Sequence, residues 1–350
     1  MTERSSAPRH GRWGLYAPFV IVLGLLAAWT VWWFILAHQV EGRLEQQAER
    51  LRQEGWDVRY AETSVTGWPF RARVAARHVS VAAPSGHAVA LPELVAEANA
   101  YQPTKWVVVA PDGLTLDRAG KGKVAVRGDA IRMSVSGLDH RWPNLALELV
   151  NPVFTAHPDS EPFPVARAAR FEFYTRPHVV GDQATTDDLD VMARLLDARG
   201  RPDGAVEGFA QEGQLTVEIE AVIGKASTLS GGDPAGVFAA WTRAGGTFQN
   251  VRGELKAGDS EATLSSDLLR ADADGRLAGS VDFQARRPGP AIAGLAGSQA
   301  VPLDRAGAAG AAATAGAASV ASDDLPLTVV FRDGRAWLGP FPIAPAPKLF

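Results

Sequence analysis

The sequence of 350 residues contains no cysteine, only three methionines and four tyrosines, and no excess of basic residues. The absence of cysteine excludes disulfide bonds, thiolate metal sites and cysteine nucleophiles. The formal net charge of −4 at pH 7 gives no basic field of the kind that nucleic-acid-binding domains carry, so we expect no nucleic acid partner. Glycine and proline are plentiful, with 35 and 23 residues, and this balance is typical of strands joined by many turns.

Motifs for catalysis are also missing. The seven histidines are scattered, without a pair at a four-residue step, and no G-x-S-x-G elbow occurs. The segment Gly120–Gly122 resembles part of a phosphate-binding loop, but it has glycine where such a loop needs Ser or Thr. The segment Asp272–Gly275 lacks the remaining ligands of a calcium loop. We therefore read both segments as turns and expect a protein that is not an enzyme, with no catalytic residue, no metal and no cofactor.

One long apolar run stands near the N-terminus. No charged residue occurs between Leu15 and Ala37, and a helix of that length crosses a hydrocarbon core of roughly 30 Å at about 1.5 Å per residue. Arg4, Arg9 and Arg12 precede the run. Basic flanks stay in the cytoplasm, so the sequence predicts a cytoplasmic tail over residues 1–14, a single-pass anchor, and a translocated remainder.

Two alternatives to an uncleaved anchor over residues 15–37 are a cleaved signal peptide and a buried helix of a soluble protein. The apolar region of a signal peptide is shorter, roughly 7 to 15 residues, and ends in small residues, whereas Ile35 and Ala37 make a poor cleavage site.

Residues 38–55 continue the helical pattern, with apolar residues at three- and four-residue steps and glutamates and arginines between them. We expect a helical stalk there that ends at Gly55.

The remainder, residues 56–350, is predicted to be a mainly β domain. Alternating segments separated by turn residues recur at short intervals, which favours a large, curved, antiparallel sheet that is groove-like or barrel-like. Two covering helices are expected, over residues 185–200 and 233–246, because each has capping residues at its start and glycine at its end. Asp233 is the expected N-cap of the second helix.

Three features are predicted for the C-terminal part of this domain. Asp274-Gly275 and Asp333-Gly334 are expected to form hairpin turns. Residues 291–324 are largely Ala, Gly and Ser and are expected to form a disordered loop, since they lack large apolar side chains. The proline-rich residues 340–350 are expected to follow an extended, polyproline-like path that caps the sheet.

The stretch SVTGWPFRARVAARHVSV, residues 64–81, raises the question of why arginines lie beside an apolar stripe. We expect Gly67 to take a positive φ in a rigid turn, after which Phe70 and the next apolar residues point inward and the arginines point outward. The valines further along the strand are an odd number of residues away from the first apolar ones, so in a regular strand they would point to the opposite face. A bulge near residues 75–77 would return them to the same face.

Several motifs occur in an order that resembles a known family. These are Gly67-Trp68-Pro69-Phe70-Arg71, Tyr101-Gln102-Pro103, Trp241 followed by Gly245-Gly246, the hairpin from Asp272 to Gly279, and Asp333-Gly334 followed by Pro340, Pro342 and Pro345. Together they resemble a family of alphaproteobacterial envelope proteins known as domain of unknown function twenty-one twenty-five. The sequence departs from the family in its Ala- and Gly-rich loop and at Ser265-Ser266, where the family often has a glycine.

The family's layout is similar to that of the AsmA-like group of anchored periplasmic proteins, which are built from long, curved, groove-forming sheets. That group is linked to envelope lipid transport and outer-membrane assembly. The resemblance therefore implies a protein of the bacterial inner membrane, with its N-terminus in the cytoplasm and its bulk in the periplasm. The implied partners are the inner membrane and lipids or other envelope proteins.

Three functions are compatible with the sequence. The first is binding of lipid or another apolar ligand in a β-groove, the second is a non-catalytic scaffold for envelope assembly, and the third is a hydrolase or glycan enzyme with a hidden site. The candidate groove-lining residues are apolar positions of predicted strands, and the simple alternative is that they form a packed core without a ligand. They are Phe70, Ala72, Val74, Val107, Val109, Leu145, Leu147 and Leu149.

Overall fold

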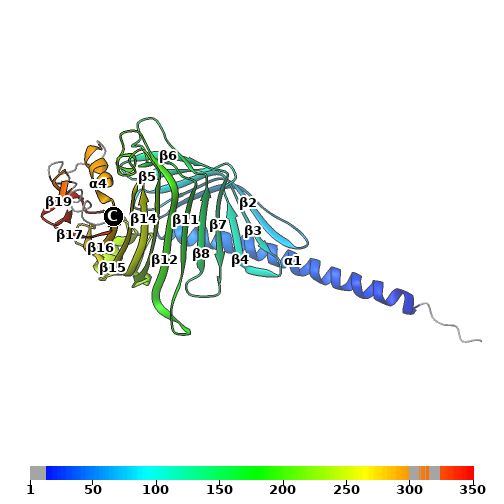
Figure 1. Ribbon diagram of the computed structural model, residues 1–350. Coiled ribbons are helices and arrows are strands. Elements are labelled where there is room, and N and C mark those ends of the chain that lie inside the picture. The colour runs from blue at the N-terminus through cyan, green and yellow to red at the C-terminus, as the bar shows by residue number, and fades with distance from the viewer. Residues whose placement is uncertain (1–12, 299–306, 308, 312, 315–323) are drawn as a thin grey trace, which may run out of the picture.

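The computed structural model describes residues 13–298, 307, 309–311, 313, 314 and 324–350. The predicted cytoplasmic tail, apart from its last two residues, and most of the predicted low-complexity loop lie outside the described residues. The predicted anchor and stalk form one continuous helix, α1 (Trp13–Gln53). Figure 1 shows that the first half of α1 projects away from the rest of the chain, whereas its second half lies beside the sheet. From Tyr16 on, α1 is long and apolar enough to cross a membrane.

The predicted mainly β fold is confirmed, since the described residues that follow α1 include one sheet of 19 strands. The strands are β1 (Asp57–Thr66), β2 (Arg71–Ala82), β3 (Ala88–Asn99), β4 (Gln102–Val109), β5 (Leu114–Arg118), β6 (Gly122–Arg127), β7 (Ala130–Ser136), β8 (Asn144–Val150), β9 (Val153–Ala156), β10 (Val165–Arg167), β11 (Arg170–Val180), β12 (Gln183–Gly200), β13 (Leu215–Gly224), β14 (Thr247–Ala257), β15 (Ser260–Ala271), β16 (Leu277–Arg286), β17 (Asp324–Arg332), β18 (Arg335–Leu338) and β19 (Phe341–Pro345).

All the strand pairings are antiparallel. The main path runs β1-β2-β3-β4-β7-β8-β11-β12 and then through consecutive strands to β19. A branch leaves β3 and returns to β12 through β5, β6, β9 and β10. This branch closes part of the sheet into a ring, and β13 to β19 extend beyond it. A hydrophobic core of residues from opposite sides of the ring includes Val126, Ile131 and Leu149.

The prediction of a helix over residues 185–200 is wrong, because this segment belongs to the long strand β12. It pairs with β11 on one side and with β13 on the other. Leu189, Val191, Ala193 and Leu195 alternate along it with Asp190, Met192 and Arg194, a period of two that fits a strand with one apolar face. The acidic residues that resembled a helix start therefore lie in a hairpin, and pairing on both sides outweighs the local helix propensity.

The second expected helix exists but begins later. It is α3 (Val237–Arg243), and Gly236 rather than Asp233 precedes its first residue. The Asp233 carboxylate accepts a hydrogen bond from the backbone N–H of Ala235 at 2.9 Å and pairs with Arg243 at 2.6 Å. The backbone hydrogen bond and then the Arg243 charge lower the pKa of Asp233. Asp233 thus closes the turn that leads into α3 instead of capping it.

The Trp241 and Gly245-Gly246 motif has a packing explanation. The Trp241 side chain is fully buried, and its indole N–H donates a hydrogen bond to the carbonyl of Gly224 at 2.8 Å. A Cβ atom on Gly246 would lie 2.1 Å from the Trp241 ring. Only glycine therefore lets the chain leave α3 against this ring and enter β14.

Two further helices pack against each other at the other end of the sheet, α2 (Ala205–Phe209) and α4 (Pro288–Gly297). A Cβ atom on Gly294 would lie 1.8 Å from the carbonyl oxygen of Gly208, so glycine permits this close contact. The first residues of the predicted disordered loop therefore belong to an ordered, alanine-rich helix, which corrects that part of the prediction. A short 3-10 turn, η1 (Ala226–Thr228), follows β13.

The turn at Gly67 and the predicted bulge in β2 are both present. Gly67 has a φ of +106°, and the peptide bond between Trp68 and Pro69 is cis. Burial alternates over Ala72, Val74 and Ala76 and then continues at Val79. His78, with a φ of 51°, lies at this change of parity, and the register between β1 and β2 shifts beside it.

The three arginines of β2 pair with acidic side chains, as their outward position allows. Arg71 and Arg73 lie 3.2 and 3.4 Å from Glu97 on β3, and Arg77 lies 3.5 Å from Glu62 on β1. Such exposed pairs contribute little to stability, typically less than about 1 kcal/mol each. Their main effect is to keep this face of the sheet polar.

The C-terminal hairpin turn is confirmed at Asp333-Gly334, where both residues have positive φ. The polyproline-like path predicted for the tail is only partly right, because Phe341–Pro345 form the strand β19, which pairs with β18 alone. Pro342 and Pro345 lack backbone donors, so they are tolerated in a strand at the edge of a sheet. The last residues then contact the β15–β16 turn, where the N–H of Leu349 donates to the carbonyl of Gly275 at 2.8 Å.

We predict that Gly67→Val destabilises the protein more than Gly120→Val does. Both glycines have positive φ, but only at Gly67 would a Cβ atom meet backbone, at 2.7 Å from the carbonyl oxygen of Arg71. Strained φ costs about 1 to 3 kcal/mol in either variant, and the clash adds to this cost at Gly67 alone. Urea unfolding of the full chain in detergent measures both losses, and equal losses would contradict the proposed role of the turn.

Candidate functional site

One face of the sheet is almost entirely apolar from β7 to β17. The register places the apolar residues of neighbouring strands directly opposite one another, as in the series Leu147, Phe173, Ala193 and Ile219. We call this surface the apolar face. Its members on β7 to β17 are Ile131, Met133, Val135, Leu145, Leu147, Leu149, Phe171, Phe173, Leu189, Val191, Ala193, Leu195, Val217, Ile219, Ala221, Leu255, Ala262, Leu264, Phe283, Ala285, Leu325, Leu327 and Val329.

The structure places most of the predicted lining residues on this face. Leu145 and Leu147 lie in its middle, whereas Leu149 is buried in the core across the ring. Ala72 and Val74, which are also buried, continue the face onto β2 through β3 and β4. The face also includes Trp106, Val108 and the apolar residues of β12, which were not among the predicted residues. The alternation of polar and apolar residues in β11 and β12 was the signal that could have identified them.

Three predicted lining residues lie elsewhere. Val107 and Val109 pair with Ser134 and Arg132 of β7, so they are on the opposite face. Three consecutive valines stand at this point, so apolar and polar residues do not alternate. The sequence therefore does not indicate which of these side chains point to which face of the sheet. Phe70 is exposed in the turn between β1 and β2, outside the strands that form the apolar face.

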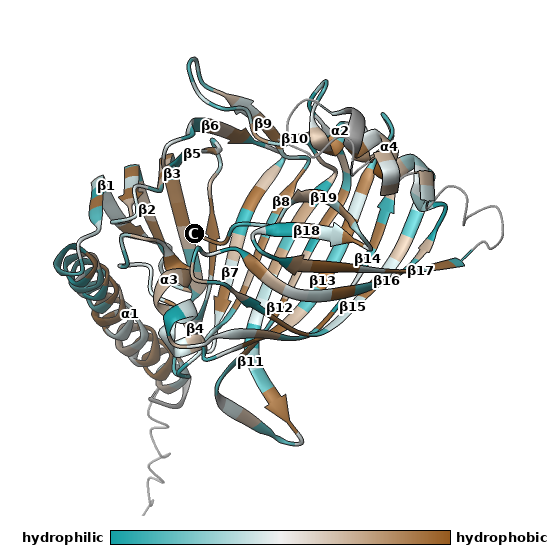
Figure 2. Cartoon of the chain, turned by 90° about the vertical axis from the view of Figure 1, so that its left-hand side faces the viewer, coloured by the Kyte–Doolittle hydropathy of each residue, from teal (hydrophilic) through white to brown (hydrophobic). Residues whose placement is uncertain are grey.

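Helices cover the two ends of the apolar face but not its middle. At one end, the Trp241 ring of α3 packs on Phe248 of β14 with 4.9 Å between ring centroids. At the other end, Val206 and Phe209 of α2 join a core formed by β10, β12, β13 and β14. Between these covers Ile219 is 37% exposed. Figure 2 shows α3 on one side of the face, and α2 and α4 on the other.

An apolar cavity of about 200 Å³ lies beneath α4. Its walls come from the apolar face, from α4, and from the β18–β19 hairpin. They include Leu255, Ala262, Phe283, Ala285, Leu327, Val329, Ile292, Leu295, Leu338 and Ile343. Apolar cavities of this kind hold hydrocarbon in preference to water, so the cavity can take a segment of an acyl chain.

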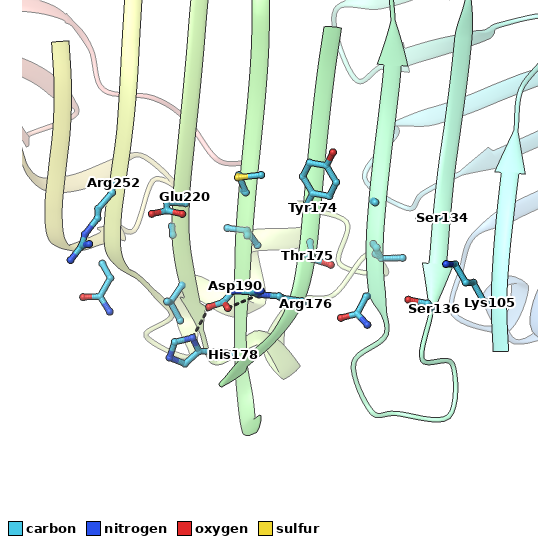
Figure 3. A pocket seen from close by; sticks show the side chains of 18 residues that line it. Lys105, Ser134, Ser136, Tyr174, Thr175, Arg176, His178, Asp190, Glu220 and Arg252 are labelled. Atoms are coloured by element: carbon cyan, nitrogen blue, oxygen red, sulfur yellow. Dashed lines mark hydrogen bonds and ion pairs between the residues drawn. The ribbon is translucent and has the colours of Figure 1, made fainter. Parts of the chain in front are cut away.

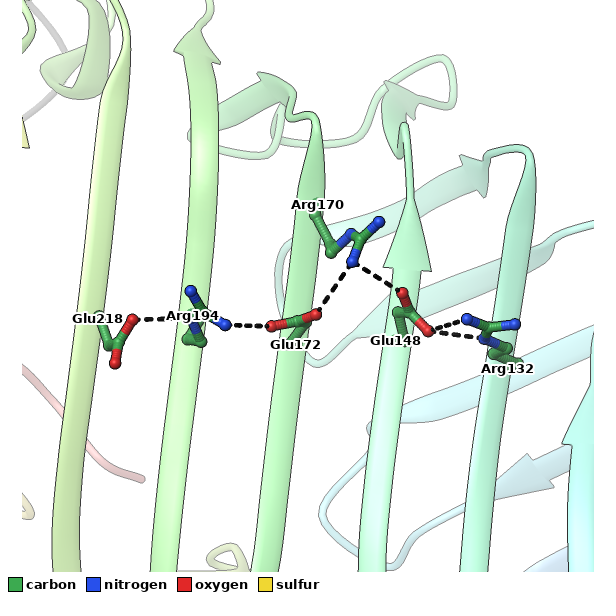
Figure 4. A network of polar contacts seen from close by, with 6 residues as sticks. All are labelled: Arg132, Glu148, Arg170, Glu172, Arg194 and Glu218. Atoms are coloured by element: carbon green, nitrogen blue, oxygen red, sulfur yellow. Dashed lines mark hydrogen bonds and ion pairs between the residues drawn. The ribbon is translucent and has the colours of Figure 1, made fainter.

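The opposite face of the sheet carries a continuous chain of ion pairs across five strands (Figure 4). Glu148 lies 2.5 Å from Arg132 and 3.4 Å from Arg170. Glu172 lies 3.5 Å from Arg170 and 3.1 Å from Arg194. The guanidinium of Arg194 also approaches Glu218, with 2.7 Å between Nε and Oε2, although without hydrogen-bond geometry.

Glu172 is the central residue of this chain and is only 5% exposed. It accepts a hydrogen bond from Arg194 and one from Arg170, so its buried charge is compensated on both sides. Tyr174 lies two residues further along β11. Burial raises the pKa of Tyr174, and the negative charges of Glu172 and Glu148 raise it further. The chain of ion pairs therefore ties neighbouring strands together rather than presenting a reactive group.

A polar hollow of about 840 Å³ lies on the same face near the β11–β12 hairpin (Figure 3). Asp190 lies between two partners, with His178 Nδ1 at 2.5 Å and Arg176 Nε at 3.0 Å. Lys105, Glu220 and Arg252 also line the hollow, so it contains charges of both signs. Both carboxylate oxygens of Asp190 are engaged in joining β11 to β12, which is a structural role.

No group of three or more His, Cys, Asp or Glu side chains among the described residues is arranged to hold a metal ion.

The remaining motif residues lie at turns and edges. Tyr101 is exposed between β3 and β4, and Pro103 is in β4, where its carbonyl accepts a hydrogen bond from the Trp106 indole at 2.9 Å. Pro340 lies in the turn between β18 and β19.

Comparisons with known proteins add one finding. The profile of a bacterial family described as "Uncharacterized protein conserved in bacteria (DUF2125)" matches residues 33–347. Searches of curated proteins and of solved structures found no match. The match begins within α1 and ends after β19, so it covers the whole sheet but not the part of α1 before Trp33 or the last three residues.

We predict that Glu172→Gln lowers the free energy of unfolding by about 1 to 3 kcal/mol, because two guanidinium groups lose their buried anionic partner. Glu218→Gln is the matched control. This change removes a carboxylate that is more exposed than Glu172 and lies at the end of the same chain of ion pairs. It should lower the free energy of unfolding by less than about 1 kcal/mol. In Glu172→Gln the pKa of Tyr174 should also fall, since a neighbouring negative charge is lost. Urea unfolding and tyrosine absorbance titration measure the two effects, and an unchanged Tyr174 pKa would contradict this arrangement.

Proposed function

Because the chain belongs to this family of uncharacterized bacterial proteins, its activity has to be inferred from the structure, and we propose that it is a single-pass inner-membrane protein that binds lipid acyl chains on the apolar face. In this proposal the sheet lies in the periplasm, and the protein acts in envelope maintenance or lipid transport without catalysing a reaction. The architectural likeness to AsmA-like proteins belongs to the same proposal and carries function only by analogy.

The membrane part of the proposal rests on α1. Its apolar half projects beyond the sheet and is exposed along its length, which in water would leave large side chains unburied. The described part of α1 is only 6% buried over its most apolar window. A bilayer would bury these side chains, which supports a membrane anchor. The arginines before it support a cytoplasmic N-terminus, which places the sheet on the other side of the membrane.

The observation that carries the lipid proposal is the open middle of the apolar face. Soluble proteins rarely expose a large contiguous apolar surface unless it binds a partner or a ligand. Here the opposite face is charged and solvated, so apolar residues are not simply spread over the whole surface. Leu147, Phe173, Ala193 and Ile219 are opposite one another in sequence across four consecutive strands, and they form an apolar track that leads toward the covered ends.

The shape of the occupant follows from these dimensions. Adjacent strands are about 4.8 Å apart, so a single row of apolar side chains that crosses several strands forms a long path, which suits an extended hydrocarbon chain. The cavity beneath α4 extends the apolar surface at one end. A folded protein partner would need a broad surface with a polar rim, whereas a chain of methylene groups needs only apolar contact. A scaffold that holds a protein segment on this face is the competing function.

We predict that a photoreactive benzoylphenylalanine at Ile219 cross-links to lipid in cell membranes, whereas the same group at Val107 does not. The two side chains are matched, since Ile219 is 37% and Val107 is 38% exposed, but they lie on opposite faces. Mass spectrometry of the purified full chain identifies the adducts. A protein adduct at Ile219 would favour the scaffold, and equal lipid adducts at both positions would contradict the proposal.

A substitution with charge gives a second test. Ile219→Lys should remove most of the lipid that co-purifies with the protein, because a charged group on the track disfavours methylene groups. Val107→Lys should leave the co-purified lipid unchanged, since it adds a cation to a face that is already charged. Equal melting temperatures of the two variants will show that the fold is intact, and loss of lipid from Val107→Lys alone would contradict the assignment of the faces.

A further inference from the structure

The hairpin ends nearest α1 expose three aromatic side chains. Trp68 and Phe70 lie in the β1–β2 turn and are 49% and 66% exposed, and Tyr101 in the β3–β4 turn is 68% exposed. The two turns are adjacent, because the N–H of Ala100 donates a hydrogen bond to the carbonyl of Phe70 at 2.8 Å. Large exposed aromatics at turns are unfavourable in water, and a group of three requires an explanation.

These turns are fixed to α1 by indole hydrogen bonds. Trp29 of α1 donates its indole N–H to the carbonyl of Pro69, and Trp33 donates to the carbonyl of Arg71, each at 2.8 Å. In the reverse direction, the Trp68 indole donates to the hydroxyl of Thr30 at 3.3 Å. Residues 29–33 of α1 therefore determine the position of these turns along the helix axis.

Apolar packing reinforces this attachment. Trp33 and Ala37 of α1 and Ala100 beside the β3–β4 turn form one buried cluster, with Trp29, Leu36 and Val65 packed around it. Trp33 is 5% exposed although it lies in an otherwise exposed helix. The sheet cannot slide along α1 without separating this cluster, so the position of α1 in a bilayer determines the position of the turns.

The depth of this attachment follows from helix geometry. Arg12 is the last charged residue before the apolar run, and about 20 helical residues span a hydrocarbon core of roughly 30 Å. Counting from Trp13, the core ends near Trp32. Residues 29–33 of α1 and the attached turns then lie where the hydrocarbon meets the headgroups. This is the layer in which Trp and Tyr side chains are enriched in membrane proteins.

We infer that the β1–β2 and β3–β4 turns enter the interfacial layer of the bilayer, with Trp68, Phe70 and Tyr101 among the lipid headgroups and the first methylene groups. The inference rests on the proposed membrane anchoring by α1. It gives the Gly-Trp-Pro-Phe motif a role, since this motif exposes Trp68 and Phe70 while the carbonyls of Pro69 and of the following Arg71 accept the indole donors of α1.

A route for lipid follows from this placement. Ala72, Ala98 and Trp106 lie near the turns and belong to the apolar face, so that face begins at the membrane surface. Ala72 and Ala98 are themselves buried, at 2% and 5% exposure, so they connect the turns to the apolar face as a covered apolar strip. The proposed lipid track and the proposed membrane contact are therefore continuous.

Site-directed spin labelling tests the inference, and the absence of cysteine from the chain makes single labels specific. The full chain is reconstituted in vesicles of phosphatidylethanolamine and phosphatidylglycerol, with one label at Phe70→Cys or at Tyr101→Cys. Val153→Cys on β9 is the matched aqueous control, because Val153 is an exposed apolar residue and β9 is far from the projecting half of α1 (Figure 2). Val22→Cys on α1 is the control for the bilayer.

We expect the labels at residues 70 and 101 to be several-fold more accessible to oxygen, relative to a water-soluble nickel reagent, than the label at residue 153. If they match the label at residue 153 while the label at residue 22 is in lipid, the turns are in water and the inference is overturned. If the label at residue 22 is itself in water, the anchoring by α1 fails, and the inference fails with it.

Discussion

The segregation of the two faces of the sheet depends on the antiparallel register. Side chains alternate strictly along a strand, so a shift of one residue in any pair would move charged residues onto the apolar face. Directly opposite positions on five strands are occupied by Arg132, Glu148, Glu172, Arg194 and Glu218. Arg132–Glu148, Glu172–Arg194 and Arg194–Glu218 attract in the observed register, and Arg170 bridges the two glutamates that face each other. A shifted strand would instead place a charge against leucine and phenylalanine.

Local irregularities preserve this segregation where strict alternation would break it. Near the end of β12, Asp197 has a φ of 50°, and the register with β13 shifts between Leu195 and Ala198. This bulge lets both residues join the same core. The change of parity at His78 in β2 has the same effect. Bulges of this kind are placed features of a sheet, because each re-aims the side chains that follow.

Much of this fold is predictable from local sequence. The charge-free run, the hairpin turns with Asp-Gly, and the Gly-Trp-Pro-Phe turn each depend on residues that are neighbours in the chain. The sequence of β12 favours a helix because Leu189, Met192, Leu195 and Leu196 fit the helical period, whereas the odd-numbered residues 189–195 fit the period of a strand. Only pairing with the two neighbouring strands decides between them. The parity of Val107 and the hydrogen bonds between Trp29 and Pro69 depend on pairing between distant segments, which one sequence without its partners in space does not reveal.

The central claim is that the middle of the apolar face is occupied by lipid. Native mass spectrometry of the full chain, released from membrane vesicles without added detergent, tests this claim most directly. The account predicts that the protein retains lipid under activation that strips loosely bound lipid from other single-pass proteins of the same membrane. A protein that loses all lipid under those conditions, or that retains a polypeptide in its place, would contradict the account.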